Sequence, residues 1–385
     1  MDEKKLRGRI LSLDVMRGIT IAGMIMVNNP GTWSDIYAPL RHAEWNGLTP
    51  TDLVFPFFMF IMGVSSYISL RKYGFRLSMA AVGKILRRTI LIFLIGLLLA
   101  WMGTSVWGIA AGASLADVLF SFDTIRILGV LPRLALAYGI AAIIALACGT
   151  KRLPAVAIGL LVVYAIILII GNGWEFSEHN ILAVADRCVL GEEHMYTDYV
   201  GGKALKFDPE GLLGTIPSVA HVLIGFMAGM MVIEAGDNDR RALKMFILGT
   251  CLIFAGFLLA YGMPINKKIW SPTFVLTTCG LASLLLGLLI YVIDIRRRSR
   301  WCYFFEVFGA NPLVLYVIGT LLSIIISVIR IPGGVSLQEG IFRGCLVPLC
   351  CGDMCLASLF YALLFVFIVW LPGLYFFRRR IYIKL

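Results

Sequence analysis

The residues best suited to chemistry lie near the start of the chain, between positions 11 and 66. His42 is the only histidine in the first 178 residues, and Asp52 follows ten positions later. A histidine can accept a proton at neutral pH, and a carboxylate bound to its other ring nitrogen would fix the tautomer and stabilise the imidazolium. Asn28, at the end of the first apolar segment, can donate an amide hydrogen bond to an oxyanion. We therefore take His42, Asp52 and Asn28 as the catalytic candidates.

Residues in this region also have purely structural explanations. Thr49 and Asp52 have the spacing of a capping box, in which they occupy the N-cap and N3 positions of the next helix. Asn29 precedes a Pro-Gly pair and is suited to capping the end of a helix. A single histidine in a loop is commonly without a special role. The sequence leaves both explanations open for His42 and Asp52.

Composition places these residues in a membrane protein. The 385-residue chain is 59% hydrophobic and 15% charged, whereas soluble domains are roughly 45–50% apolar and about 25% charged. Several apolar stretches have the length of about 20 residues that a membrane-spanning helix needs. The net charge of +11 does not form one basic patch, because the basic residues fall in short clusters between apolar stretches. That pattern is typical of membrane orientation rather than of nucleic-acid binding.

The apolar stretches predict an all-α integral membrane protein with about ten transmembrane helices in a single domain, residues 1–385. The expected helices lie near 11–29, 52–70, 89–107, 127–148, 154–171, 215–235, 245–262, 272–293, 304–328 and 357–376. The first of them is expected to stay as an uncleaved anchor, because charged residues interrupt it and no small-residue cleavage motif follows.

The basic residues predict the orientation of these helices. Alternate loops carry 23 lysines and arginines on one side and 8 on the other, so we expect both termini to be cytoplasmic. The three long outer loops are then 30–51, 172–214 and 329–356. Four of the nine cysteines crowd into the last of them. That spacing allows unpaired packing or a disulfide, and we predict no metal site.

Four residues are candidates for binding an anionic cofactor. Arg88 belongs to a basic cluster at the cytoplasmic end of the third helix, which positive-inside topology also explains. Arg126 and Arg133 are seven positions apart, so we expect them on one face of the fourth helix, where pairing with Asp123 or Glu210 is the alternative. The fourth is Asn311, which precedes a proline and either breaks the ninth helix beside a cavity or caps it.

Longer motifs resemble those of a known family. The segment RHAEWNGLTPTDLVFPFFMFIMG, preceded by SLDVMRGITIAGMIMVNN, is similar to the transmembrane acetyltransferase family of heparan-alpha-glucosaminide N-acetyltransferase. Further similar segments follow in order, namely LRRTILIFLIGLL, DTIRILGVLPRLALAY, FDPEGLLGTIPSVAHVLIGFMAG and FGANPLVLYVIG. Together they cover nearly the whole chain.

The resemblance implies transfer of an acetyl group from cytosolic acetyl-CoA to the amine of a terminal glucosamine on the far side of the membrane. It implies that His42 is catalytic and that Asn28 and Asp52 line the same centre, with Trp45, Asn46 and Glu210 as acceptor-binding candidates. The family's lysosomal enzyme carries a luminal domain and one more helix before this region, whereas nine residues precede the first helix here. The chain therefore resembles the bacterial branch, and we expect an inner-membrane protein with His42 on the periplasmic side. A homodimer is compatible with this interpretation.

Two alternatives remain at this level. The acceptor can be another envelope amino sugar or a hydroxyl group, because the sequence does not distinguish acceptors. A glycan or small-molecule transporter is the rival class, in which Asp14, Arg17, Arg126 and Arg133 would line a permeation path. The motif around His42 and the lack of an internal repeat favour the enzyme. Direct transfer in one complex and an acetyl-histidine intermediate both fit the residues.

Overall fold

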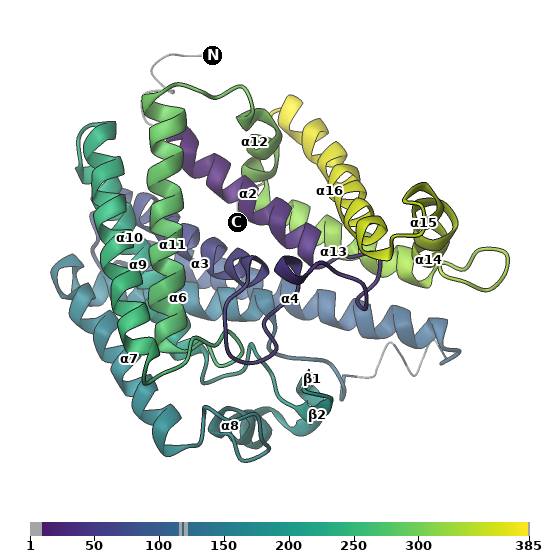
Figure 1. Cartoon of the computed structure of the whole chain (residues 1–385). Helices are drawn as coiled ribbons and strands as arrows, with labels where there is room; N and C mark the ends of the chain where they lie inside the picture. Colours follow the sequence, from purple (N-terminus) through teal and green to yellow (C-terminus); the bar gives the residue numbers. More distant parts are fainter. Residues whose placement is uncertain (1–9, 115–117, 119–121, 384–385) are drawn as a thin grey trace.

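The apolar stretches fold into long helices that pack side by side (Figure 1). The computed structural model describes residues 10–114, 118 and 122–383. Within these residues, eight helices are long and apolar enough to cross a membrane, and a ninth is obtained if the bent pair α12–α13 is counted as one span. The predicted all-α membrane fold is confirmed, with eight or nine spans by length and composition where the sequence predicted about ten.

The helices have the following bounds: α2 Leu11–Val27, α3 Val54–Leu70, α4 Met79–Ala110, α6 Val130–Cys148, α7 Leu153–Ile170, α8 Ile181–Leu190, α9 Thr215–Glu234, α10 Asn238–Ala260, α11 Pro272–Leu289, α12 Cys302–Ala310, α13 Pro312–Val328, α14 Leu337–Glu339, α15 Val347–Leu349 and α16 Met354–Arg378. A short turn, η2 (Pro50–Leu53), leads into α3. One antiparallel hairpin joins β1 (Thr197–Val200) to β2 (Lys203–Lys206). Helix α2 occupies the first predicted span, with 17 residues.

Several helices differ from their predicted bounds; α10, for example, begins at Asn238, seven positions before its predicted start. Helix α4 begins at Met79, ten positions before its predicted start, so Arg88 lies inside the helix rather than at its end. Helix α6 begins at Val130, so the prediction that Arg126 belongs to this helix is wrong. The ninth predicted helix is broken at Asn311, where α12 and α13 meet at 87°. Proline cannot donate the next helical hydrogen bond, which explains the break. The basic residues before position 10 and Lys384 lie outside the described residues.

Close helix contacts depend on glycine. A Cβ atom at Gly63 of α3 would lie 2.3 Å from the carbonyl oxygen of Val222 in α9, and one at Gly225 would lie 2.2 Å from that of Phe60. The two helices approach so closely because neither glycine has a side chain, as is common where helices pack in membranes. Helices α9, α10 and α11 also contact one another and stand side by side in Figure 1. This packing gives a rigid frame for the loops at its ends.

The three long loops predicted on one side do gather at one end of the helices. Loop 30–51 contacts loop 172–214 through a hydrogen bond from Trp45 to the carbonyl oxygen of Trp174, and it contacts the 329–356 segment through Gln338 and Pro30. Helix α8 and the β1–β2 hairpin lie within loop 172–214 (Figure 1). Among the described residues, the nine cysteines are free thiols. The interhelical loops at this end therefore form one assembly.

Candidate functional site

The local sequence of residues 41–53 builds a buried carboxylate. Thr49 and Asp52 form the predicted capping box at the start of η2. One oxygen of Asp52, Oδ2, accepts hydrogen bonds from the Thr49 amide at 3.1 Å, the Thr49 hydroxyl at 2.9 Å and the Ala43 amide at 3.1 Å. The side chain is almost fully buried. These bonds fix the Asp52 carboxylate at the start of α3.

The second oxygen of Asp52 contacts His42. Asp52 Oδ1 lies 2.6 Å from His42 Nδ1, and the imidazole is 42% exposed. A carboxylate accepts hydrogen bonds, so the arrangement assigns the proton to Nδ1 and leaves the Nε2 lone pair as the acceptor. The predicted contact between these residues is thus present. The pair has the geometry of a general base held by a carboxylate.

A third charged group, Lys267, was not among the sequence-based candidates. Its Nζ atom lies 2.9 Å from His42 Nδ1, 3.4 Å from Nε2 and 3.4 Å from Asp52 Oδ1. Its side chain is 17% exposed. Burial lowers the pKa of the Lys267 ammonium, against the opposing effect of Asp52 and Glu210. Its distance of 225 positions from His42 gives the sequence no local signal of this contact.

The loop that carries Lys267 is fixed to the His42 loop. Gly47 donates its amide hydrogen to the Ile265 carbonyl oxygen at 2.8 Å, and the fully buried Asn266 donates from its side chain to Asn46 at 3.2 Å. Asn266 also accepts a hydrogen bond from the Ile269 amide. Two backbone segments far apart in the sequence therefore hold Lys267 against His42.

A second charged cluster lies in the loops of the same end. Arg126 lies in the loop before α6, where it binds both carboxylate oxygens of Asp208 and one oxygen of Glu210. Burial opposes ionisation of Glu210, but Arg126, Arg133 and Lys267 outweigh it and lower the pKa of this carboxyl. The pairing of Arg126 with Glu210 was one of the two predicted explanations. Asp123 is not a partner of Arg126 in these contacts.

Arg133 fixes the same segment from within α6. Its guanidinium donates to the carbonyl oxygens of Pro209 and Gly211 at 2.8 and 2.9 Å, and it lies over the Trp270 ring. The side chain is fully buried. Arg126 and Arg133 therefore brace residues 208–211, and neither lies on the wall of the large cavity described next.

A cavity of about 790 Å³ lies among α2, α3, α4, α6 and α13. One part of its wall is polar and has an excess of positive charge. It contains Arg17, Lys84, Arg88, Ser65 and Ser69, together with Asp14, which pairs with Arg17 at 3.1 Å. Most of the remaining wall is apolar. A volume of this size and a mainly apolar wall with a few convergent polar groups are typical of ligand sites. The basic part suits an anion such as a phosphate.

The cavity wall includes the first turns of α3, the helix that follows Asp52. Phe58 of α3 lines the cavity and follows Asp52 by six positions, which is roughly 9 Å along a helix. Ile383 also lines the wall. Asn311 holds this terminal segment, because its side chain donates to the Ile381 carbonyl oxygen and accepts from the Ile383 amide, both at 2.8 Å. Asn311 thus breaks the helix beside a cavity, and its side chain binds protein rather than lining the wall.

The structure gives three other candidates different surroundings. The Asn28 side chain is exposed at the end of α2 and is not among the partners of Asp52. Asn29 instead caps α2, with its side chain bound to the Ile25 carbonyl oxygen. Trp45 packs in an aromatic cluster, 5.3 Å from Phe176. Asn46 is exposed and bound to Asn266.

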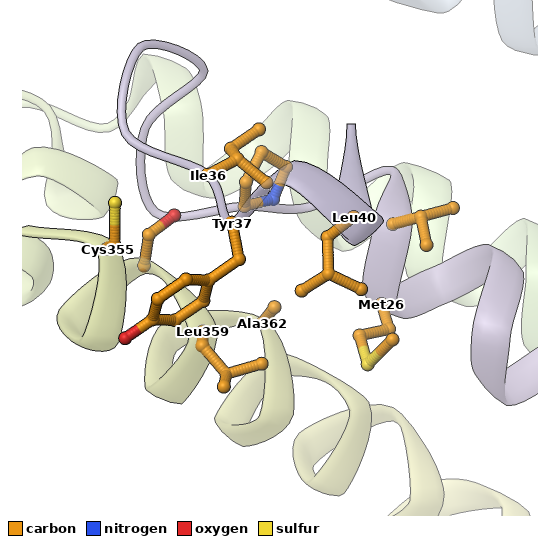
Figure 2. A pocket seen from close by; sticks show the side chains of 10 residues that line it. Met26, Ile36, Tyr37, Leu40, Cys355, Leu359 and Ala362 are labelled. Atoms are coloured by element: carbon orange, nitrogen blue, oxygen red, sulfur yellow. The ribbon is translucent and has the colours of Figure 1, made fainter. Parts of the chain in front are cut away.

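A second, small pocket lies beside α16. Figure 2 shows Tyr37 and Leu40 of the first long loop directed toward Cys355 and Leu359 of that helix. The volume is about 20 Å³, enough for about one water molecule. It therefore does not compete with the large cavity as a ligand site. In the described ranges, no group of three or more His, Cys, Asp or Glu side chains is arranged to hold a metal ion.

The helices and the paired His42 and Asp52 define a polytopic membrane protein with a histidine–carboxylate site at one end of its bundle. The chain belongs to the heparan-alpha-glucosaminide N-acetyltransferase catalytic family, whose sequence profile matches residues 9–261. The human protein named heparan-alpha-glucosaminide N-acetyltransferase is 28% identical over 370 residues, covering 80% of this chain and 52% of its own length. The mouse protein of that name is 26% identical over 366 residues, covering 80% and 53%. The chain thus spans about half the length of these curated relatives, and Lys267 lies beyond the matched profile.

Proposed function

We propose that the protein is a membrane-embedded N-acetyltransferase that moves an acetyl group from acetyl-CoA to the amine of a glucosamine-type acceptor. The observation that carries the proposal is the 2.6 Å contact between His42 Nδ1 and Asp52 Oδ1, in the turn that leads into α3, one of the helices that line the large cavity. Family membership supports the same reaction. The proposed catalytic residues are His42 and Asp52, with Asn28 at the end of α2 as a further amide donor.

The large cavity is the proposed acetyl-CoA site. Its basic part, with Arg17, Lys84 and Arg88, suits the phosphates of coenzyme A, and its apolar part suits the pantetheine arm. Asn311 contributes by holding the terminal segment against one end of the cavity. The Arg126, Arg133 and Glu210 cluster has an indirect role in this proposal, because it braces the loops around His42.

The reaction needs a proton acceptor. As the amine attacks the thioester carbon, it loses a proton and the carbon–sulfur bond breaks. The sulfur takes up that proton from His42, so coenzyme A leaves as the thiol. His42 Nε2 accepts the amine proton, while Asp52 keeps Nδ1 protonated and balances the positive charge on the ring. The alternative, in which Nε2 first takes the acetyl group, uses the same atoms in two steps.

The sidedness follows from the charge of the loops. We propose a bacterial inner-membrane protein with both termini cytoplasmic. His42 then lies on the outer side, because the basic residues concentrate on the opposite loops. The donor then enters from the side where coenzyme A is made, and its thioester end reaches His42 through the helices.

Labelled acetyl-CoA tests the proposal with purified protein in detergent. We expect N-acetylglucosamine products from glucosamine or from oligosaccharides that end in glucosamine, identified by mass spectrometry. A panel that adds other amino sugars and hydroxyl acceptors defines the acceptor class. Failure to transfer acetyl to any of them would contradict the proposed function. Uptake of an acceptor into proteoliposomes without transfer would instead support the transporter alternative.

A further inference from the structure

The contacts around His42 give Lys267 a specific part in the reaction. A carboxylate 2.6 Å from an imidazole nitrogen favours the charged imidazolium. An imidazolium has no lone pair with which to accept a proton from an amine. In a pair composed of His42 and Asp52 alone, the carboxylate would therefore work against the free lone pair that a base needs.

Lys267 has the opposite effect on His42, because its positive charge disfavours the imidazolium. Its Nζ atom contacts both members of the pair, at 2.9 Å from His42 Nδ1 and 3.4 Å from Asp52 Oδ1. A cation at this distance disfavours a second positive charge on the ring and offsets the negative charge of the carboxylate. The group formed by these three side chains has no net charge when the imidazole is neutral.

We infer that Lys267 is a positioning residue that keeps His42 neutral between turnovers, so that Nε2 is available to accept the proton of the acceptor amine. This inference rests on the proposed acetyltransferase function. It assigns to Lys267 a charge effect on His42 rather than a bond to either substrate.

The groups around Lys267 act on its charge in both directions, and burial, which lowers the pKa of the ammonium, has the largest effect. Asp52 and Glu210 face Lys267 and favour protonation, whereas burial and the neighbouring Lys268 oppose protonation. The loop contacts through Asn266 and Gly47 fix the backbone from which Lys267 extends. The cation is therefore placed by the fold and does not depend on a flexible surface side chain.

Lys268 is a matched control in the same loop. Its Nζ atom lies 2.7 Å from Asp198 Oδ2, and it also contacts the Tyr199 carbonyl oxygen of the β hairpin. Its side chain is about as buried as that of Lys267, with exposures of 14% and 17%. Replacement of Lys268 removes the same charge from the same loop without removing a contact of His42.

The test uses diethyl pyrocarbonate, which transfers an ethoxycarbonyl group to a neutral imidazole nitrogen and needs no acetyl-CoA or acceptor. The rate of modification of His42 is followed against pH by peptide mass spectrometry, with the exposed His179 as an internal reference. In Lys267→Met and Lys267→Gln, we expect the midpoint of the His42 curve to rise by about one pH unit. Lys267→Arg should keep the wild-type midpoint, as should Lys268→Met.

Kinetics provide the second measurement. The acidic limb of the pH profile of kcat/KM reports the protonation of the free enzyme's essential base. The midpoint of this limb should therefore move to higher pH in Lys267→Met and Lys267→Gln, together with the midpoint of the His42 modification curve. The glutamine variant keeps an N–H donor for Asp52 and separates loss of charge from loss of a hydrogen bond. An unchanged His42 midpoint in both variants, or an equal shift in Lys268→Met, would overturn the role of Lys267. A wild-type protein that transfers no acetyl would contradict the proposed function, while the modification curves would still decide the charge effect.

Discussion

The carboxylate of Asp52 caps the turn before α3 with one oxygen and binds His42 Nδ1 with the other. The two proposed explanations of Asp52, a helix cap and a partner of His42, are therefore both present in the structure. One residue couples the start of a membrane-spanning helix to the exposed imidazole. Variants of the pair and of the cap can separate these roles.

Removal of the imidazole should abolish turnover without unfolding the protein. His42 is 42% exposed, so His42→Ala leaves no buried cavity of the kind that costs several kcal/mol. We expect a fall of roughly 10²–10⁴-fold in kcat, the usual contribution of a general base. Binding of acetyl-CoA, measured by calorimetry, should stay close to wild type. Near-normal turnover with glucosamine would refute the mechanism.

Asp52→Asn should reduce turnover as well as stability. All groups around Asp52 are donors, namely the two backbone amides, the Thr49 hydroxyl, His42 and Lys267. An asparagine places its own N–H groups against some of them and removes the charge that balances the imidazolium. We expect kcat to fall at least about tenfold, together with a lower melting temperature in detergent.

Thr49→Ala provides the control for the cap. It removes one hydroxyl bond to Asp52 Oδ2 and leaves the contact with His42. Loss of a cap side chain costs about 1 kcal/mol, so the melting temperature should fall while kcat changes little. If Asp52→Asn and Thr49→Ala had the same effect on both quantities, Asp52 would be only a cap.

The distance along the chain explains what the sequence could predict of this site. His42 and Asp52 are ten residues apart, and a capping box fixes the second of them, so local rules place both. Lys267 reaches them only through the packing of loop 261–271 on loop 41–52. No local pattern encodes that contact. The hairpin was also missed, although Gly201 and Gly202 between two short polar segments are a recognised turn signal.

The boundaries of the helices also depend on tertiary contacts that a local sequence pattern does not encode. Hydropathy predicted α4 from position 89, because the charged Lys84, Arg87 and Arg88 resemble a loop. The structure starts α4 at Met79, and Lys84 and Arg88 line the cavity. A charged residue can lie within a helix at membrane depth when it faces a cavity. The arrangement that permits it is tertiary, so the apolar pattern alone misplaces the boundary.

Arg88 should contribute to donor binding. It lines the basic part of the cavity and lies over the Tyr138 ring, 4.6 Å from its centroid. Arg88→Met removes one charge-assisted contact to a phosphate, so KM for acetyl-CoA should rise about tenfold with a smaller change in kcat. Arg87→Met is the matched control, because Arg87 is exposed and lies outside the cavity wall. Equal effects of the two variants on KM would argue against the cavity as the donor site.

The orientation can be tested at the hairpin. Lys203 is exposed in β2 and belongs to the loops proposed to lie outside. A single cysteine at Lys203, in a background without the native cysteines, should react with an impermeant maleimide in intact cells. A cysteine at Arg240, whose side chain is 76% exposed at the other end, should react only after permeabilisation. The reverse labelling pattern would overturn the proposed sidedness.

A buried aspartate should make stability depend on pH. Asp186 in α8 accepts a hydrogen bond from the Leu212 amide with Oδ1, while Oδ2 is buried and without a hydrogen-bond partner among the described residues. Burial, with a smaller effect of the nearby Asp208, raises the pKa of Asp186 to about 6. The folded protein therefore binds a proton that the unfolded chain releases at lower pH.

The sign of the effect follows from that raised pKa. The stabilisation is complete below the unfolded value near 4 and is lost as the pH rises through about 6. Asp186→Asn has no such proton, so its free energy of unfolding relative to wild type should increase between pH 4.5 and 7.5, by at most about 3 kcal/mol. Its melting temperature relative to wild type should rise over the same range. A constant difference between Asp186→Asn and wild type over this range would show that Asp186 does not titrate in this window.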